Sequence, residues 1–207
     1  MSLSTTVIVN GINNLSDARY CAAMGVDVVS FNLKQGHEDQ VQPETLKEIA
    51  GWVAGVQLCG EFENERPEEI NQLAEEFKLD LVQLDAPYLI DEIEQISRPV
   101  IQKMFVNKDS TAAELLEIME LYSPYVKYFL LYSHDFTAID DTNTAFLKKL
   151  ATHYPILVGF GLGKENIKEV LEKVKPAGIG LQGGHEEKPG FKDFDELQDI
   201  FEEIEID

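Results

Sequence analysis

Short apolar runs recur along this chain at intervals of roughly 25 residues. They are brief, rich in β-branched and aromatic residues, and apolar at neighbouring positions, which predicts strands buried on both faces of a parallel sheet. The eight predicted strands are residues 5–10, 27–32, 53–59, 79–85, 100–106, 128–133, 155–161 and 177–183.

Between these runs the apolar positions repeat with helical spacing, most clearly at 67–77, 110–122, 164–174 and 194–204. Eight strand–helix units predict an α/β fold, a single (β/α)₈ barrel. A doubly wound open sheet is the competing architecture, but it usually needs only five or six strands. No Gly-, Ser- or Pro-rich linker interrupts the chain, so residues 1–207 are predicted to form one barrel domain.

Composition narrows the choice of partners. The 17 basic and 38 acidic residues give a net charge of −21, which argues against nucleic acid or an anionic membrane as partner. Cys21 and Cys59 form no CxxC pair, and we expect a reducing, cytoplasmic setting. Neither a signal peptide nor an apolar run of membrane-spanning length is found in the sequence.

In a barrel of this type the chemistry lies where the strands end. Asp85 and Lys103 end neighbouring strands and are expected to face each other, either as a substrate-binding or acid–base pair or as an ion pair closing the core. Cys59 is expected at the end of the third strand, as a relocated base or as an inert buried thiol. Three glycines after the last two strands predict either a phosphate site or tight turns: Gly161, Gly183 and Gly184.

Three histidines in the predicted mouth loops are each followed by an acidic residue: His37, His134 and His185. Imidazole and carboxylate together can bind a divalent metal. The alternative is that these are solvated loop residues, because no tight ligand spacing such as HExxH is present. The sequence therefore predicts no metal and no cofactor.

Several motifs carry a resemblance to a known family. The sequence VNGINNLSDA at 9–18 is similar to KICGITN-x-x-DA, LDLVQLD at 79–85 to LDLVQLHG, and PGFKD at 189–193 to PGxKD. Further matches lie at 25–31, 98–101 and 161–166. The whole chain thus resembles the phosphoribosylanthranilate isomerase (TrpF) family of tryptophan biosynthesis. The resemblance implies a barrel, a phosphorylated small-molecule substrate, and a cofactor-free aldose–ketose type isomerase, an intramolecular oxidoreductase.

The family reaction is an Amadori rearrangement of a phosphoribosylamine, in which one group protonates the ribose ring oxygen and another removes the proton from carbon 2′. By resemblance the base is a Cys where this chain has Asn10, and the acid is an Asp where it has Tyr132. Asn cannot accept a proton at neutral pH, and Tyr, with a pKa of about 10, is a weaker acid than Asp. Losing both roles would slow the reaction by on the order of 10⁴-fold or more.

The resemblance also affects substrate binding. It places Asp39 where an Arg is expected to hold the anthranilate carboxylate, and Asp85 where the family has a His. The sequence therefore predicts a family barrel whose ancestral activity is lost or changed. The alternatives are a non-catalytic barrel that binds a small metabolite or a protein, and a metal-dependent enzyme. Both a monomer and a homodimer remain open.

Overall fold

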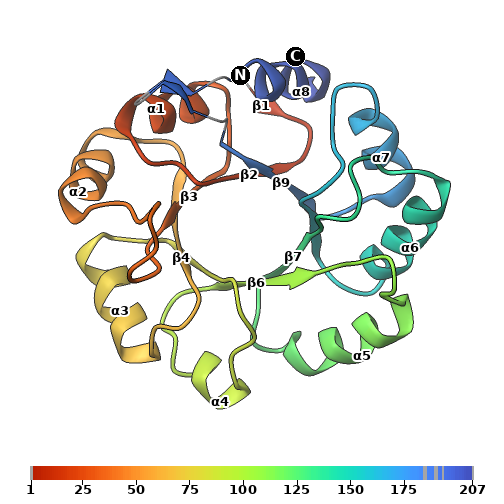
Figure 1. The fold of residues 1–207 in the computed structure, drawn as a ribbon, viewed down its shortest axis with the longest axis horizontal. Coiled ribbons are helices and arrows are strands. Elements are labelled where there is room, and N and C mark those ends of the chain that lie inside the picture. Colours follow the sequence, from red (N-terminus) through yellow and green to blue (C-terminus); the bar gives the residue numbers. More distant parts are fainter. Residues whose placement is uncertain (1, 184–185, 189–190, 193, 207) are drawn as a thin grey trace.

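The expected barrel is present in the computed structural model, which describes residues 2–183, 186–188, 191–192 and 194–206. Within these residues eight parallel strands pair in chain order from β2 to β9, and β9 pairs with β2 to close the sheet. Figure 1 shows the helices around the outside of this ring. The strands are β2 (Thr6–Asn10), β3 (Val28–Asn32), β4 (Gln57–Phe62), β5 (Leu81–Leu84), β6 (Val100–Phe105), β7 (Tyr128–Tyr132), β8 (Ile156–Val158) and β9 (Gly178–Gln182).

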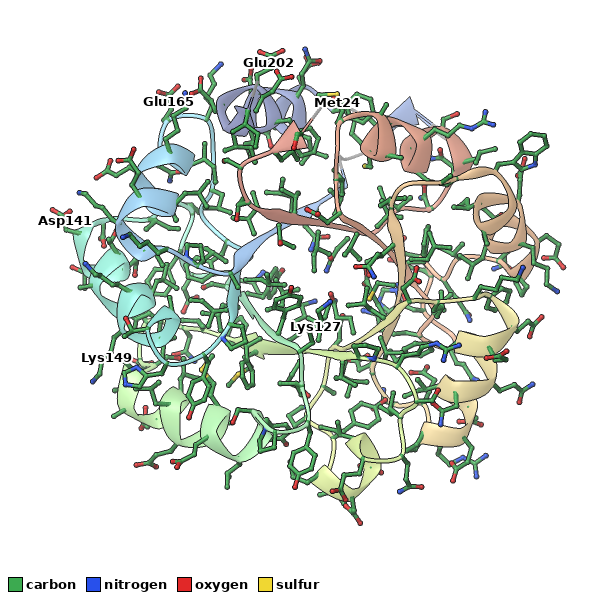
Figure 2. All side chains as sticks on the ribbon, turned by 180° about the vertical axis from the view of Figure 1, so that it is seen from behind. Met24, Lys127, Asp141, Lys149, Glu165 and Glu202 are labelled. Atoms are coloured by element: carbon green, nitrogen blue, oxygen red, sulfur yellow. The ribbon has the colours of Figure 1, made fainter. Side chains whose placement is uncertain are left out.

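The helices cover the outer face of the sheet and follow the strands one by one. They are α1 (Leu15–Ala23), α2 (Pro43–Trp52), α3 (Pro67–Glu76), α4 (Ile90–Ile93), α5 (Ala112–Tyr122), α6 (Asp141–Ala151), α7 (Ile167–Val174) and α8 (Asp195–Ile204). Most of their charged residues face outward, as Figure 2 shows for Lys149 and Glu202, whereas Asp17 of α1 is buried. None of the described helices is long and apolar enough to cross a membrane.

Short strands join distant parts of the chain outside the barrel. β1 (Ser2–Leu3) pairs antiparallel with β12 (Glu205–Ile206), so the two ends of the described chain lie side by side. β10 (Glu186–Lys188) pairs with β11 (Phe191–Lys192) in the segment between β9 and α8.

The barrel interior is filled by one layer of apolar side chains drawn from successive strands. Side chains of a strand alternate between its two faces, so each of seven strands directs one member of this cluster into the barrel interior. The members are Ile8, Val28, Cys59, Leu81, Ile101, Leu130 and Leu157. The eighth strand contributes Gly180, where a Cβ would lie 2.5 Å from Cδ1 of Leu130.

The predicted boundary of the third barrel strand was wrong. The run 53–59 was predicted as a strand, but Val53 is the C-cap of α2, and the chain turns through Gly55 at φ +84° before β4 begins. β4 then continues past Cys59, because Glu61 pairs with both Asn32 and Gln83 in the parallel ladder. Cys59 therefore lies in mid-strand within the core and not at the mouth.

Candidate functional site at the barrel mouth

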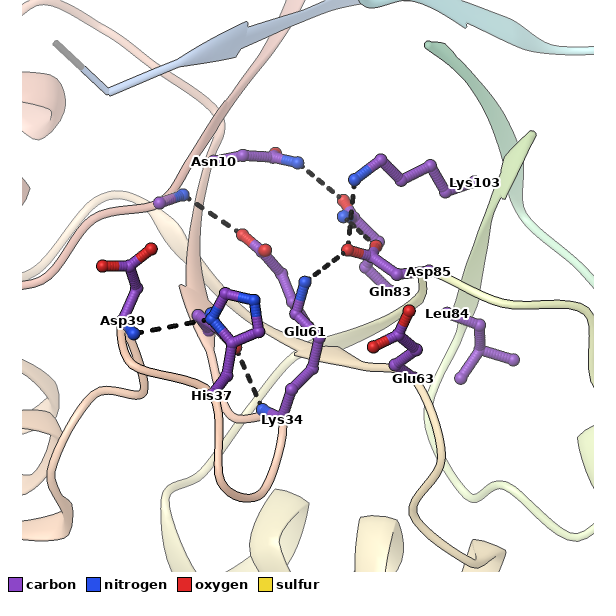
Figure 3. Close-up of polar contacts among 12 residues, drawn as sticks. Asn10, Lys34, His37, Asp39, Glu61, Glu63, Gln83, Leu84, Asp85 and Lys103 are labelled. Carbon is purple, nitrogen blue, oxygen red and sulfur yellow. Dashed lines mark hydrogen bonds and ion pairs between the residues drawn. The ribbon is translucent and has the colours of Figure 1, made fainter. Parts of the chain in front are cut away.

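A polar layer lies above the apolar one. Two residues beyond Ile8, Cys59, Leu81, Ile101 and Leu130, the same strands direct polar or aromatic side chains into the open end of the barrel. These side chains are Asn10, Glu61, Gln83 and Lys103 (Figure 3), together with Tyr132. Strand geometry alone thus brings together residues from β2, β4, β5, β6 and β7.

Asp85 is the centre of the hydrogen bonds in this layer. Its Oδ2 accepts from Nζ of Lys34 at 2.8 Å and from Nζ of Lys103 at 3.1 Å. Its Oδ1 accepts from Nε2 of Gln83 at 2.7 Å. The predicted contact between Asp85 and Lys103 is confirmed, whereas Lys34, which lies two residues beyond β3, was not predicted (Figure 3).

The contacts of Asp85 determine its ionisation. Burial alone would raise the pKa of the Asp85 carboxyl, but the charge of Lys103 and the hydrogen bonds from Lys34 and Gln83 outweigh it and lower the pKa. Burial alone would likewise lower the pKa of the Lys34 ammonium, and the hydrogen bond and charge of Asp85 instead raise it. This cluster therefore holds a carboxylate between two cations.

Asn10 stands at the end of β2 and is 2 % exposed. Its Nδ2 donates to Oε1 of Gln83 at 3.1 Å, and its main-chain oxygen accepts from the N–H of Gly183 at 2.7 Å. Its Oδ1 is buried without a hydrogen-bond partner in the part of the chain that the structure describes. Position 10 is thus a fixed amide that carries no titratable group.

Glu61 was missed by the sequence analysis. The carboxylate is 6 % exposed, and its Oε1 accepts from the N–H of Gly11 at 3.1 Å. Burial and then the charge of Asp85 raise its pKa, while the charge of Lys103 opposes them. The signal that could have found it is the alternation after Cys59, which directs residue 61 inward once the strand is extended.

Tyr132 ends β7 within an aromatic cluster at the rim. Its hydroxyl lies 3.1 Å from Nδ1 of His134, and the two rings meet edge to face. The Nζ of Lys103 lies 4.8 Å from the centre of the Tyr132 ring, within the range of a cation–π contact. The phenol is therefore held from two sides.

An open cavity of about 840 Å³ lies above the polar layer. Its lining includes Glu61, Lys103, Tyr132, Phe160 and Asp39. Glycines of the last two strand ends complete the wall, including Gly161 and Gly183. The volume falls in the range of sites for small molecules.

The glycines that were predicted to bind phosphate differ in the contacts of their main-chain groups. Gly161 has a φ of +63° and lines the cavity, and its main-chain oxygen accepts from the Asn166 side chain at 2.7 Å. The N–H of Gly183 is already donated to Asn10, so it does not point freely at a ligand. Gly184 and His185 lie outside the described residues.

The histidine loops do not assemble a metal centre among the residues that the structure describes, where no three His, Cys, Asp or Glu side chains gather suitably. Nδ1 of His37 lies 3.1 Å from Nδ2 of Asn32, and the main-chain N–H of Asp39 lies 3.5 Å from the same nitrogen. The side chain of His37 thereby contacts the end of β3 and its own loop.

Comparison with known proteins identifies the family. A family profile described as N-(5'phosphoribosyl)anthranilate (PRA) isomerase matches residues 7–203. The chain belongs to the PRA isomerase family. It is 30% identical over 196 residues to N-(5'-phosphoribosyl)anthranilate isomerase of Geobacter sulfurreducens. The alignment covers 88% of this chain and 90% of that protein.

Solved structures share the barrel. A dimeric phosphoribosylanthranilate isomerase of Thermotoga maritima, solved as monomers, superimposes with a TM-score of 0.79 at 24% identity and covers 97% of this chain and 98% of that one. A second PRA isomerase structure, in complex with reduced 1-(o-carboxyphenylamino)-1-deoxyribulose 5-phosphate, gives a TM-score of 0.77 at 24% identity with the same coverage. At this identity the likeness concerns the fold.

Proposed function

We propose that this PRA isomerase family barrel binds a phosphorylated, sugar-derived ligand at its mouth, and that positions 10 and 132 no longer carry out the proton transfers of the family reaction. One observation carries the proposal. Asn10 is a buried carboxamide bound to Gln83, and an amide cannot take a proton from carbon at neutral pH.

Tyr132 supports the same conclusion. Its hydroxyl lies 3.1 Å from Nδ1 of His134, so the phenol is held at the rim by its own segment. Binding is supported by the cavity and by Gly161, whose left-handed backbone brings the chain close to the open space. A relative that binds a phosphorylated sugar derivative supports the class of ligand.

Binding is tested by calorimetry with inorganic phosphate and with N-(5'-phosphoribosyl)anthranilate. Gly161→Ala should weaken both about tenfold or more, because φ is +63° and the new Cβ would lie 3.0 Å from the carbonyl carbon of Ala138. Gly163→Ala is the matched control, since its Cβ would meet nothing within 4 Å. Failure of both compounds to bind would contradict the binding half of the proposal.

The claim that positions 10 and 132 transfer no proton is tested by kinetics with N-(5'-phosphoribosyl)anthranilate at high enzyme concentration. Asn10→Ala and Tyr132→Phe should change kcat less than about threefold, because neither side chain transfers a proton. A drop of tenfold or more in Tyr132→Phe would make Tyr132 the acid and overturn this claim.

A further inference from the structure

We infer that Glu61 is the base of a relocated proton-transfer site in the barrel mouth, with the ammonium of Lys103 as its acid. The inference rests on the proposed function, in that it takes a phosphorylated, sugar-derived ligand as already bound there. It adds that the base and the acid lie on β4 and β6, whereas the family resemblance implies a base on β2 and an acid on β7.

The position of Glu61 is the first step. Its carboxylate lines the cavity and accepts a hydrogen bond of 3.1 Å from Gly11, the residue directly after Asn10. A proton acceptor is thus held beside the end of β2, next to the position that has lost one (Figure 3). Gly11 and Glu61 both line the cavity, so a ligand bound there meets this carboxylate.

The surroundings of Glu61 suit a base. Burial and the charge of Asp85 raise its pKa, and a base is most effective when its pKa approaches the working pH. Lys103 opposes this shift and so limits it. The charged and titratable groups around it are Lys34 and His37 after β3, Cys59 on β4, Asp85 after β5, Lys103 on β6 and Tyr132 on β7. Asp39 and Glu196 of α8 line the same cavity.

Lys103 is placed to serve as the acid. Its ammonium lines the same cavity, and its side chain is 19% exposed. The hydrogen bond to Asp85 and the ring of Tyr132 fix its direction. An ammonium has three N–H donors, so the bond to Asp85 leaves donors for a ligand oxygen.

The chemistry balances without any cofactor. Lys103 gives a proton to the ribose ring oxygen as the bond from carbon 1′ to that oxygen breaks, and the amine lone pair forms an iminium. Glu61 takes the proton from carbon 2′, and the C–H electron pair forms the 1′–2′ double bond of an enaminol. Glu61 then protonates carbon 1′, the 2′-hydroxyl returns a proton to Lys103, and a ketone remains.

A purely structural role for Glu61 would be to hold the amide of Gly11. Glu61→Gln separates the two roles, because the Gln side chain has the same shape and keeps an oxygen that accepts from Gly11, but it cannot take a proton. Glu63→Gln is the matched control, since it makes the same chemical change at an exposed rim residue on the same segment.

The experiment measures kcat, KM and the pH profile with N-(5'-phosphoribosyl)anthranilate for the wild type and these variants. Glu61→Gln should lower kcat about 100-fold or more. It should leave KM within about threefold and remove the acid limb of the profile. Glu61→Asp should retain that limb with reduced kcat, and Glu63→Gln should match the wild type.

Two results would overturn the inference. One is a kcat of Glu61→Gln within about threefold of the wild type. The other is a wild type that binds the probe in calorimetry and does not turn it over, which leaves the binding half of the proposed function standing. Absence of binding itself would instead overturn the proposed function, so the two failures are distinguishable.

Discussion

The carboxamide of Asn10 donates a hydrogen bond of 3.1 Å to the side-chain oxygen of Gln83, across the mouth from β2 to β5. Gln83 in turn donates to Asp85, so position 10 is joined to the charged cluster through one neutral link. The side chain of Asn10 therefore has a structural part in the polar layer that does not depend on any ligand.

The first prediction concerns this link. Asn10→Ala leaves Oε1 of Gln83 without its donor in a buried site, so the free energy of unfolding should fall by about 1 kcal/mol. Urea denaturation at pH 7 measures the change. Asn64→Ala, at an exposed loop position, should stay within about 0.5 kcal/mol of the wild type. An Asn10→Ala variant as stable as the wild type would contradict the structural role.

The second prediction concerns Asp85. Asp85→Asn leaves Lys34 and Lys103 without their shared carboxylate, so the free energy of unfolding at pH 7 should fall by about 2 to 3 kcal/mol. This value is smaller than for a fully buried ion pair, because both lysine side chains are partly exposed to solvent. Because the pKa of Asp85 is lowered on folding, its contribution is present above the unfolded value of about 3.8 and is lost as the pH falls through the folded value.

Urea denaturation between pH 3 and pH 7 checks the prediction for Asp85. The difference between Asp85→Asn and the wild type should shrink as the pH falls below 3.8, and Asp109→Asn, at an exposed loop residue, should show almost no difference at any pH. A gap of constant size down to pH 3 would mean that the carboxylate charge is not what stabilises this cluster.

The third prediction concerns the effect of ionising the Glu61 carboxyl on the stability of the folded chain. Since its pKa is raised on folding, its contribution to stability is fully present below about pH 4.5, the value of an unperturbed carboxyl, and is lost as the pH rises through the folded pKa. Glu61→Gln should therefore be more stable than the wild type at pH 8, with the difference closing toward pH 4. Such a gain, together with a loss of kcat, is typical of a residue kept for chemistry.

Urea denaturation at pH 4, 6 and 8 measures this effect. Glu63→Gln should follow the wild type at all three values, because that side chain is exposed. A Glu61→Gln variant that is less stable than the wild type at pH 8 would show that the ionised carboxylate is a net stabilising group.

Much of the barrel could be predicted from the sequence because apolar runs mark buried strands directly. The contact between Lys103 and Asp85 was predicted correctly because both follow short, mostly apolar segments of neighbouring strands. Lys34 could not be placed, since it lies in a loop whose path only the folded chain determines. Glu61 was missed because the apolar run continues from α2 through the turn into β4, so the predicted strand began and ended too early.

The fourth prediction concerns packing in the barrel interior. Gly180→Ala would place a Cβ 2.5 Å from Cδ1 of Leu130, so stability should fall by about 1 to 3 kcal/mol. Gly51→Ala, inside α2 with nothing within 4 Å of the new Cβ, should instead gain about 0.5 to 1 kcal/mol. Urea midpoints at pH 7 measure both. Equal effects of the two substitutions would contradict the packing of this layer.

The last prediction concerns the two thiols and the expectation that Cys59 could serve as a relocated base. Cys59 and Cys21 are both fully buried, and burial together with the charge of Glu61 raises the pKa of the Cys59 thiol. The thiolate is the reactive form of a cysteine. An aromatic disulfide reagent at pH 8 should therefore label the folded chain no faster than the chain unfolds. In urea, both thiols should react. Cys21→Ser isolates Cys59 in the same assay. Rapid labelling of Cys59 in that variant, with the fold intact, would restore the thiol as a candidate base and weaken the case for Glu61.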